Sequence, residues 1–255
     1  MNKLYNDSYL KKTTEFINYI KTKSYDLLEL KDHDILLEIG CGNGYDAIEL
    51  SKRVGNTGKV YGIDIEKKLI EKAIQNALTN KSHNVEFIVS DAECIPFEDN
   101  YFDNIRVERV FQHLQNPNEV AEEAIRVLKP GGKFLMIETD WYGMNIYINN
   151  ESVEQKIKDV LLKKVLKNGY ASRNLFSYLK SSGMKDIKIA AYPVLIENYS
   201  LADELIKFDN IIKTGLEEHL IDQKDVDEWN ETINYLSEKK CFNLTTNMVF
   251  VWGTK

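Results

Sequence analysis

The 255-residue chain contains little cysteine, little proline and no long apolar run. The three cysteines, Cys41, Cys94 and Cys241, lie far apart and form no CxxC motif, which argues against a disulfide framework and a structural zinc site. The four histidines are also isolated, so we expect no metal site. No apolar run approaches the roughly 18 residues of a membrane-spanning helix, and residues 1–16 contain no apolar core of a signal peptide. We therefore expect a cytoplasmic protein that does not insert into a membrane.

The chain also lacks a block of positive charge. Its 33 lysines and arginines are interspersed with 40 aspartates and glutamates, which gives a formal net charge of -7. A surface with this sign is not suited to neutralising nucleic-acid phosphates, so we expect no nucleic-acid partner. The hydrophobic share of 43% and the charged share of 29% are typical of a globular protein. The oligomeric state cannot be read from these numbers.

Short apolar runs alternate with amphipathic segments along the first 140 residues. An apolar stripe predicts a helix over 66–79, and Asn116-Pro117 marks the start of another helix, which Lys129-Pro130-Gly131-Gly132 ends. The apolar runs are typical of strands buried on both faces of a parallel sheet. They are ILLEIG (35–40), VYGIDI (60–65), VEFIVS (85–90), FDNIRV (102–107) and KFLMIET (133–139). This alternation predicts an α/β fold with a doubly wound sheet.

The rest of the chain is mainly helical in pattern. We expect helices over 8–30, 151–167, 172–182 and 199–238, and a strand over 184–192. The last segment, 242–255, alternates enough to be a final strand, antiparallel and at or near the edge of the sheet.

A glycine-rich motif joins the first predicted strand to a helix. Gly40, Gly42 and Gly44 allow a tight turn and let the backbone approach a ligand closely, and the helix that follows offers free N–H groups. A dinucleotide-binding turn is usually GxGxxG and would need Gly or Ala at the position of Tyr45. The motif therefore argues against a nicotinamide cofactor, and an ordinary glycine-rich turn is the alternative.

Acidic residues follow the second and third predicted strands. Asp64 can accept hydrogen bonds from both hydroxyls of a ribose, with Ile65 against one face of an adenine, although an N-cap role would also explain an aspartate there. After the third strand, a carboxylate of the Asp91-Ala92-Glu93 segment can accept the adenine amino group, and the Ala92 backbone can meet the ring. Aspartate is common in turns, so this third signal depends on its agreement with the glycine motif and Asp64.

Together these segments resemble the motifs of class I S-adenosylmethionine-dependent methyltransferases, in the small-molecule branch of ubiquinone- and menaquinone-biosynthesis enzymes. The resemblance covers residues 34–140 and implies a single Rossmann-like methyltransferase domain over 1–255, with a mostly parallel seven-stranded sheet. It is carried by EIGCGNG (38–44), YGIDIE (61–66), SDAECIPFEDNYFD (90–103), ERVFQHLQNP (108–117) and RVLKPGGKFLMIE (126–138).

The resemblance also implies a cofactor, S-adenosylmethionine, with S-adenosylhomocysteine as product and no metal. The glycine loop would cradle the methionine part of the cofactor, and Cys41 would occupy a small-residue position in that loop. Glu38 would lie near the ammonium group, while Glu108 and Arg109 would lie beside the sulfonium and the substrate entrance. The adenosine part would be held by Asp64, Ile65, Asp91, Ala92 and Glu93.

The segments that resemble the family least must cover the carboxyl edge of the sheet, where open α/β sheets bind ligands. These segments are the N-terminal helix, residues 140–170 and residues 193–241. We expect an N-terminal helical cap over 1–30, a cofactor-binding core over 34–140 and a helical lid insertion over 193–241. Tyr5 or Tyr9 of the cap could close over the methionine end. The covering segments are rich in aromatic residues, which fits an apolar or aromatic acceptor, although helix packing would explain most of them individually. These residues are Tyr5, Tyr9, Trp141, Tyr142, Tyr147, Tyr170, Tyr192, Tyr199, Phe208 and Trp229.

We expect methyl transfer to an oxygen, nitrogen or carbon nucleophile of a small molecule. A methyltransferase acting on protein or RNA and a cofactor-binding protein without transfer activity remain alternatives. Three residues are candidates for the chemistry. His113 could act as a base, since an unperturbed imidazole titrates near neutrality, although a structural role in capping or packing its helix is slightly favoured. Arg109 could bind an acidic group of the acceptor, and Asp140 could bind an amine.

Overall fold

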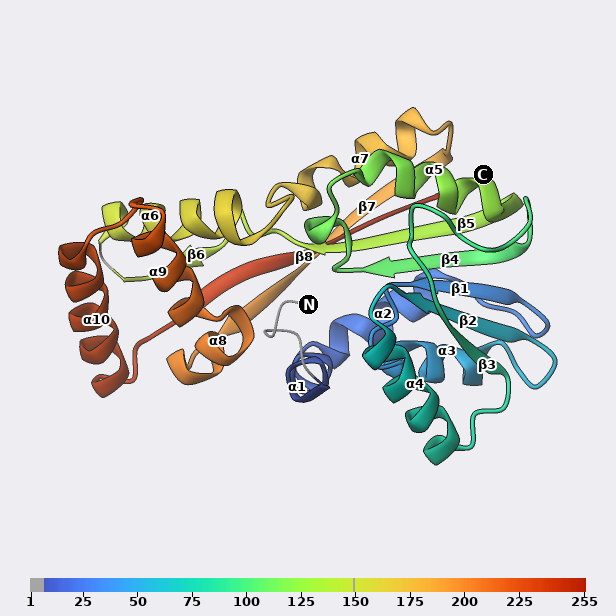
Figure 1. The fold of residues 1–255 in the computed structure, drawn as a ribbon, viewed down its shortest axis with the longest axis horizontal. Helices are drawn as coiled ribbons and strands as arrows, with labels where there is room; N and C mark the ends of the chain where they lie inside the picture. Colours follow the sequence, from blue (N-terminus) through green and yellow to red (C-terminus); the bar gives the residue numbers. More distant parts are fainter. Residues whose placement is uncertain (1–6, 149) are drawn as a thin grey trace.

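A mostly parallel β-sheet organises the molecule in the computed structural model, which describes residues 7–148 and 150–255 (Figure 1). Its strand order is β3-β2-β1-β4-β5-β8-β6, and β7 also pairs with β8. The parallel strands are β1 (Ile35–Ile39), β2 (Lys59–Asp64), β3 (Val85–Val89), β4 (Phe102–Glu108) and β5 (Leu128–Thr139). The antiparallel strands are β6 (Asn145–Ile146), β7 (Lys185–Ile196) and β8 (Leu244–Thr254). The predicted doubly wound α/β sheet is confirmed, and the two-residue β6 is added to the seven strands expected.

Helices cover both faces of this sheet (Figure 1). One face carries α2 (Asn18–Leu27), α3 (Tyr45–Arg53) and α4 (Lys67–Asn80), and the other carries α5 (Pro117–Val127) and α7 (Ala171–Ser181). The apolar stripes that predicted these helices supply the residues that they bury, such as Val120, Ala121 and Ala124 of α5. The helices expected over 66–79, 172–182 and from Pro117 onward are thereby confirmed.

The ends of β7 and β8 extend beyond the parallel part of the sheet and carry a helical lobe (Figure 1). The lobe contains α6 (Glu151–Val160), α8 (Tyr199–Ile206), α9 (Phe208–Glu217) and α10 (Gln223–Glu238). Phe208 and Trp229 are fully buried in its centre. They belong to the same apolar cluster as Leu36 of β1 and Ile137 of β5, so the lobe and one face of the sheet share a continuous core.

Three predicted boundaries are wrong. The single helix expected over 8–30 is two helices, α1 (Asp7–Phe16) and α2, because Ile17 leaves the helical region with φ -99° and ψ 16°. The helix expected over 151–167 ends at Val160 and continues as a π-turn to Val165. The lid does not start at residue 193, because β7 continues to Ile196, which is buried and pairs with Leu244.

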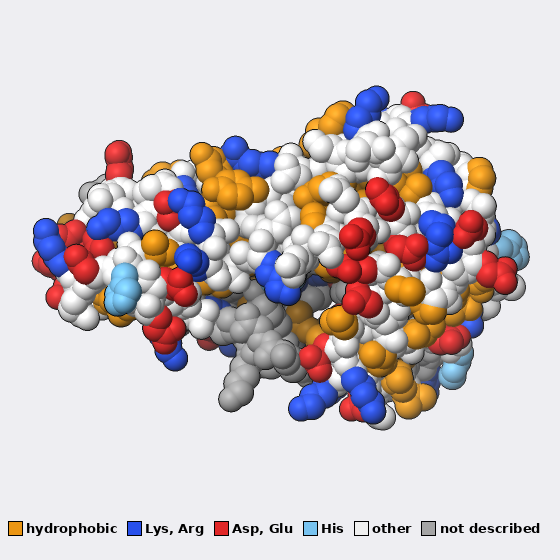
Figure 2. All heavy atoms as spheres, turned by 45° about the horizontal axis from the view of Figure 1, so that its top comes forward, with side chains coloured by type: hydrophobic (Ala, Val, Ile, Leu, Met, Phe, Trp, Pro, Cys, Tyr) orange, Lys and Arg blue, Asp and Glu red, His pale blue; other side chains and the backbone are white. Residues whose placement is uncertain are grey.

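Charged side chains of both signs are interspersed over the face shown in Figure 2. Acidic and basic groups lie close to one another on the sheet and on the helical lobe, as the sequence led us to expect. Within residues 7–148 and 150–255, no helix has the length and apolar character needed to cross a membrane.

Candidate active site

The glycine loop between β1 and α3 is built from closely packed backbone. Gly40, Gly42 and Gly44 have φ values of +69°, +54° and +80°, a region that side chains other than glycine rarely adopt. A Cβ at Gly40 would lie 2.2 Å from Val110 Cγ2, and one at Gly44 would lie 2.5 Å from Phe87 Cζ. Both positions therefore require glycine, and they fix the loop against β3 and the end of β4.

Asp64 connects this loop to the end of β2. One carboxylate oxygen accepts a hydrogen bond from the Gly42 amide at 3.0 Å, and the other accepts one from the Glu66 amide at 2.9 Å. Burial raises the pKa of Asp64, and the two amide donors oppose that rise. Next to it, Ile65 exposes 70% of its surface. A carboxylate with remaining lone pairs beside an uncovered apolar side chain fits a ribose and an adenine ring.

The segment after β3 lies next to Asp64. The Ser90 amide donates to the Asp64 carbonyl at 3.0 Å, which brings the two predicted adenosine contacts together. Asp91 is exposed and accepts a hydrogen bond from the Glu93 amide at 3.0 Å, so it also stabilises its own turn. Ala92 is half-buried. The residues predicted to hold adenosine are therefore adjacent, at the carboxyl ends of neighbouring parallel strands.

A buried ion cluster lies beneath the loop. Arg106 of β4 is completely buried and forms ion pairs with Glu38 and Glu108, while its Nε donates to Ser24 Oγ at 3.1 Å. Lys21 of α2 lies 2.5 Å from Asp46 Oδ2 and 2.8 Å from Glu108 Oε1. The cluster joins α2, α3, β1 and β4 in one network.

The carboxyl groups of this cluster titrate differently from one another. Burial raises the pKa of Glu38 to about 8, although Arg106 opposes the rise. At Asp46 and Glu108, Lys21 and Arg106 outweigh the effect of burial and lower the pKa. One oxygen of Glu38, Oε2, is buried without a hydrogen-bond partner. This open acceptor at the base of the glycine loop fits the predicted contact with an ammonium group.

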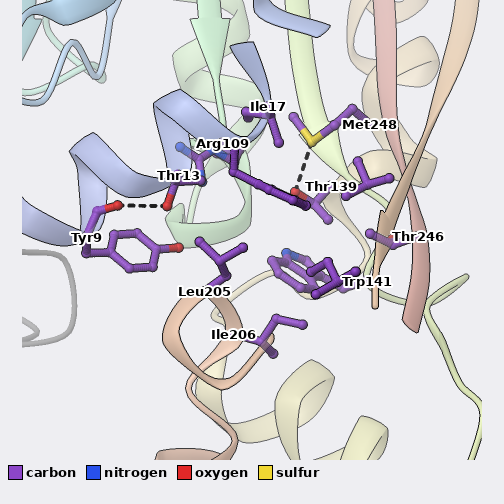
Figure 3. A pocket seen from close by; sticks show the side chains of 13 residues that line it. Tyr9, Thr13, Ile17, Arg109, Thr139, Trp141, Leu205, Ile206, Thr246 and Met248 are labelled. Carbon is purple, nitrogen blue, oxygen red and sulfur yellow. Dashed lines mark hydrogen bonds between the residues drawn. The ribbon is translucent and has the colours of Figure 1, made fainter. Parts of the chain in front are cut away.

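Two adjoining pockets lie beside the ion cluster and, counted together with the solvent they open to, enclose about 440 and 400 Å³. Their shared residues come from α1, the end of β5 and α8 (Figure 3). In the first pocket, Tyr9 and Arg109 lie on the α1 side, opposite Trp141, Leu205 and Ile206. The rest of its lining is mainly apolar and consists of Thr13, Phe16, Ile17, Thr139, Val194, Ile196, Thr246 and Met248.

A chain of hydrogen bonds holds Trp141 in the wall of the second pocket. Trp141 Nε1 donates to the side-chain oxygen Oε1 of Gln112 at 2.5 Å. The backbone N–H of Gln112 donates to Glu138 Oε1 at 3.3 Å. Burial raises the pKa of Glu138 to about 8, and its other oxygen is buried without a partner. The sequence analysis missed Glu138, Gln112 and Arg106. For Glu138 and Arg106, a charged residue within an otherwise apolar strand was the available signal.

Of the three residues predicted for the chemistry, Arg109 alone lines a pocket. His113 and Asp140 are not among the described residues that line either one. Burial, with Arg109 and Lys167 nearby, lowers the pKa of His113 to about 4, so the near-neutral pKa expected from the sequence is wrong. Asp140 Oδ1 accepts hydrogen bonds from the Gly143 amide and from Ser172 Oγ, both at 3.2 Å, which turns it toward the start of α7.

Two further predicted residues can be placed. Glu108 is the last residue of β4 and belongs to the ion cluster, where it contacts Lys21, Arg106 and Arg109. Cys41 is buried within the glycine loop, and burial raises the pKa of its thiol well above the usual value. A reactive thiolate is therefore not part of this site. Within the described part of the chain, no three His, Cys, Asp or Glu side chains are grouped so that they could hold a metal ion.

The aromatic residues predicted for the acceptor pocket have different locations. Tyr9 and Trp141 line it. Tyr199, Phe208 and Trp229 pack against one another inside the helical lobe, with the Tyr199 and Phe208 ring centroids 5.9 Å apart. Helix packing, the alternative explanation, holds for these three. The remaining residues are Tyr192, which packs on Phe250, the exposed Tyr142, Tyr147 and Tyr170, and Tyr5, which lies outside the described residues.

Comparison with known proteins identifies a methyltransferase domain. A family model described as a methyltransferase domain matches residues 30–234. A 37.1 kDa protein of transposon TN4556 from Streptomyces fradiae, uncharacterized, is 30% identical over 194 residues, which cover 76% of this chain and 56% of that protein. The demethylmenaquinone methyltransferase of Staphylococcus saprophyticus is 34% identical over 112 residues, covering 44% of this chain and 47% of the enzyme. The matched stretches therefore span about half the length of these relatives.

Solved structures confirm the fold. Phosphoethanolamine N-methyltransferase 2 of Haemonchus contortus, in complex with phosphomonomethylethanolamine and S-adenosylhomocysteine, superimposes with a TM-score of 0.63 at 18% identity. The match covers 100% of this chain and 59% of that one. The predicted resemblance to class I methyltransferases is confirmed by the family model and by this shared architecture.

Proposed function

Because the chain belongs to the methyltransferase domain family, we propose that it transfers a methyl group from S-adenosylmethionine to a small molecule with an apolar or aromatic body. One observation carries the proposal. The glycine loop with Asp64 and the apolar pockets around Trp141 open at the same carboxyl edge of the sheet, at opposite sides of the end of β4.

The residues at this edge fit the parts of the cofactor. Asp64 and the segment around Asp91 would hold the adenosine, and the glycine loop with Glu38 Oε2 would hold the methionine end. When bound, S-adenosylmethionine supplies an electrophilic methyl group on a positively charged sulfur. Methyl transfer is an in-line displacement that needs little covalent help once the nucleophile is aligned. The chain's contribution is to orient the acceptor and to exclude water from it.

We propose a structural role for His113, the alternative that the sequence left open. Among the described residues, His113 lines neither pocket, and its Nε2 lies 3.0 Å from Gln112 Nε2, whose amide N–H donates to the ring and cannot carry a proton away from an acceptor. With a pKa of about 4, the imidazole is also a weak base at pH 7. An acceptor whose nucleophile is already deprotonated needs no base.

Calorimetry of the purified protein tests the cofactor part of the proposal. We expect S-adenosylhomocysteine to bind in the micromolar range and NAD not to bind. Asp64→Ala should weaken S-adenosylhomocysteine binding by about 10- to 100-fold, because it removes charge-assisted hydrogen bonds. Tighter binding of NAD than of S-adenosylhomocysteine would refute the proposal.

Turnover with radiolabelled cofactor tests the acceptor class. We propose that label enters small molecules and not protein or RNA, that EDTA leaves turnover unchanged, and that the protein acts in the cytoplasm. Label in added RNA or protein would favour a macromolecular methyltransferase, and cofactor binding without transfer to any acceptor class would favour a non-catalytic role.

A further inference from the structure

Arg109 occupies a strained position that points its side chain into the first pocket. It follows directly on β4, and its φ of +54° lies in the left-handed region, where a non-glycine residue is destabilised by roughly 1 kcal/mol or more. The conformation is held by its amide, which donates to the Ile137 carbonyl at 2.8 Å, and by Gln112 Nε2, which donates to its carbonyl at 3.3 Å. The β5 backbone and the short helix after β4 thus fix a cation at the wall of a mainly apolar pocket (Figure 3).

The guanidinium of Arg109 is incompletely paired. Its Nε lies 3.3 Å from Glu108 Oε1, but Lys21 Nζ is closer to the same oxygen, at 2.8 Å, and Arg106 binds the other oxygen of Glu108. Glu108 is therefore shared by three cations. The terminal Nη groups of Arg109 donate no hydrogen bond to any other described residue, and its Nε is a buried donor without a well-aligned acceptor.

Arg109 belongs to a buried group of carboxyl groups and cations. Lys21 and Arg106 pair closely with carboxyl groups of this group, whereas Arg109 approaches Glu108 at 3.3 Å. The carboxyl groups are Glu38, Asp46, Glu108 and Glu138, and the cations are Lys21, Arg106 and Arg109. Of the three cations, Arg109 is the one that lines the pocket.

We propose that Arg109 determines acceptor specificity by binding an anionic group, a carboxylate or a phosphate, of an acceptor whose apolar or aromatic body lies between Phe16, Trp141 and Met248. This inference rests on the proposed function. Arginine suits the task because its planar donors match both anions and because it stays charged when buried. The methionine carboxylate of the cofactor is the other anion that could reach this region. The lining of the pocket includes no residue of the glycine loop, which favours the acceptor.

Matched neutral and anionic probes test the proposal on the full-length protein saturated with S-adenosylhomocysteine. Binding of 3-phenylpropanoate and 3-phenylpropan-1-ol is measured by calorimetry and by the change in tryptophan fluorescence. We expect the carboxylate to bind about tenfold more tightly or better. Arg109→Met should abolish this preference, and Arg109→Lys should keep part of it. Arg53→Met is the matched control, since it removes an exposed arginine that pairs with Asp26 outside the pocket.

The cofactor is tested separately. S-adenosylhomocysteine and 5′-methylthioadenosine, which lacks the methionine carboxylate, should each bind Arg109→Met as tightly as they bind the wild type. Selective weakening of S-adenosylhomocysteine would mean that Arg109 holds the cofactor, and would overturn the assignment to the acceptor. Equal binding of the two phenylpropyl probes to the wild type would also overturn it, whether or not Arg109→Met folds. Failure of the wild type to bind S-adenosylhomocysteine would instead refute the proposed function.

Discussion

The buried charge of Arg106 is balanced by carboxyl groups inside the protein. It is fully buried, and its guanidinium is the common partner of Glu38 and Glu108. Arg106→Met would leave these carboxyl groups without their main counter-charge. Breaking a buried ion pair by removing one partner typically destabilises a protein by about 3–5 kcal/mol, and we expect a loss of that size in urea unfolding.

The matched control is Arg53→Met. Arg53 pairs with Asp26 at the surface, where its side chain is 36% exposed and that of Asp26 is 65% exposed. Surface pairs contribute about 0–1 kcal/mol, so this variant should be nearly as stable as the wild type. Similar losses for the two variants would show that the buried cluster is not a stabilising feature of the fold.

His113 gives a prediction of pH dependence at the same scale. Its pKa falls from an unfolded value near 6.5 to about 4 in the folded protein, because burial disfavours the charged ring. The unfolded chain therefore binds the proton first, so this residue leaves stability unchanged above pH 6.5 and lowers it progressively toward pH 4. At pH 5 the loss should be about 1–2 kcal/mol. We expect His113→Gln to lose less stability than the wild type between pH 7.5 and pH 5 in urea titrations, and equal losses would contradict the shift.

The same residue illustrates what a sequence leaves open. The spacing of His113 from Glu108 predicted a position near the pocket, and the chain does bring it next to Gln112. The spacing contained no information about the burial that lowers its pKa. The positions of Asp64 and the glycine loop were predictable, because they depend on local turns at strand ends. The ion cluster was not, since Lys21 and Arg106 meet only after α2 packs on the sheet.

At the scale of helices and strands, the helices of the predicted cap and lid differ in how many of their side chains are buried. The helices α1 and α8 border the pocket and are linked at the surface by Lys12 and Glu204. In contrast, α10 buries Trp229 and Ile233 and begins with a capping box at Asp222. Few buried contacts favour local opening, and a packed amphipathic face opposes it. The sequence predicted a cap over 1–30 and a lid over 193–241 without this distinction, because helical periodicity does not reveal which face finds a partner.

Hydrogen exchange tests this distinction. We expect amides of α1 and α8 to exchange faster than those of α10 in the ligand-free protein, and to slow when S-adenosylhomocysteine and 3-phenylpropanoate are added. Amides of α10 should change little. Equal protection of the three helices without ligand would mean that α1 and α8 do not open over the pocket.

At the scale of the whole molecule, the helical lobe and the sheet form one apolar core. The cluster that contains Trp229 and Phe208 continues through Leu244 and Phe250 of β8 to Leu36 and Leu50 near the other end of the sheet. The lobe extends from β7 and β8, which pair with each other along their length, and β8 also pairs with β5. A lobe that depends on shared strands for its core should not unfold separately from the sheet. We therefore expect the wild type to unfold in urea in a single transition, seen equally by fluorescence and circular dichroism.

The variant Trp229→Ala tests whether the helical lobe and the sheet unfold in one transition. The side chain is fully buried in the lobe, packs on Phe208 at a centroid distance of 5.1 Å, and is far along the chain from the cofactor loop. Truncating a buried tryptophan typically costs about 3–5 kcal/mol because of the lost burial and the cavity left behind. If the core is continuous, the variant should keep a single unfolding transition at a lower urea concentration. Saturating S-adenosylhomocysteine should raise the midpoint of this transition as it does for the wild type. The reason is that a ligand bound to the folded state stabilises every part that unfolds with it. Two separated transitions, with the ligand shifting only the second, would instead show that the lobe is an independent unit and that the pocket it borders can be lost while the cofactor site remains folded.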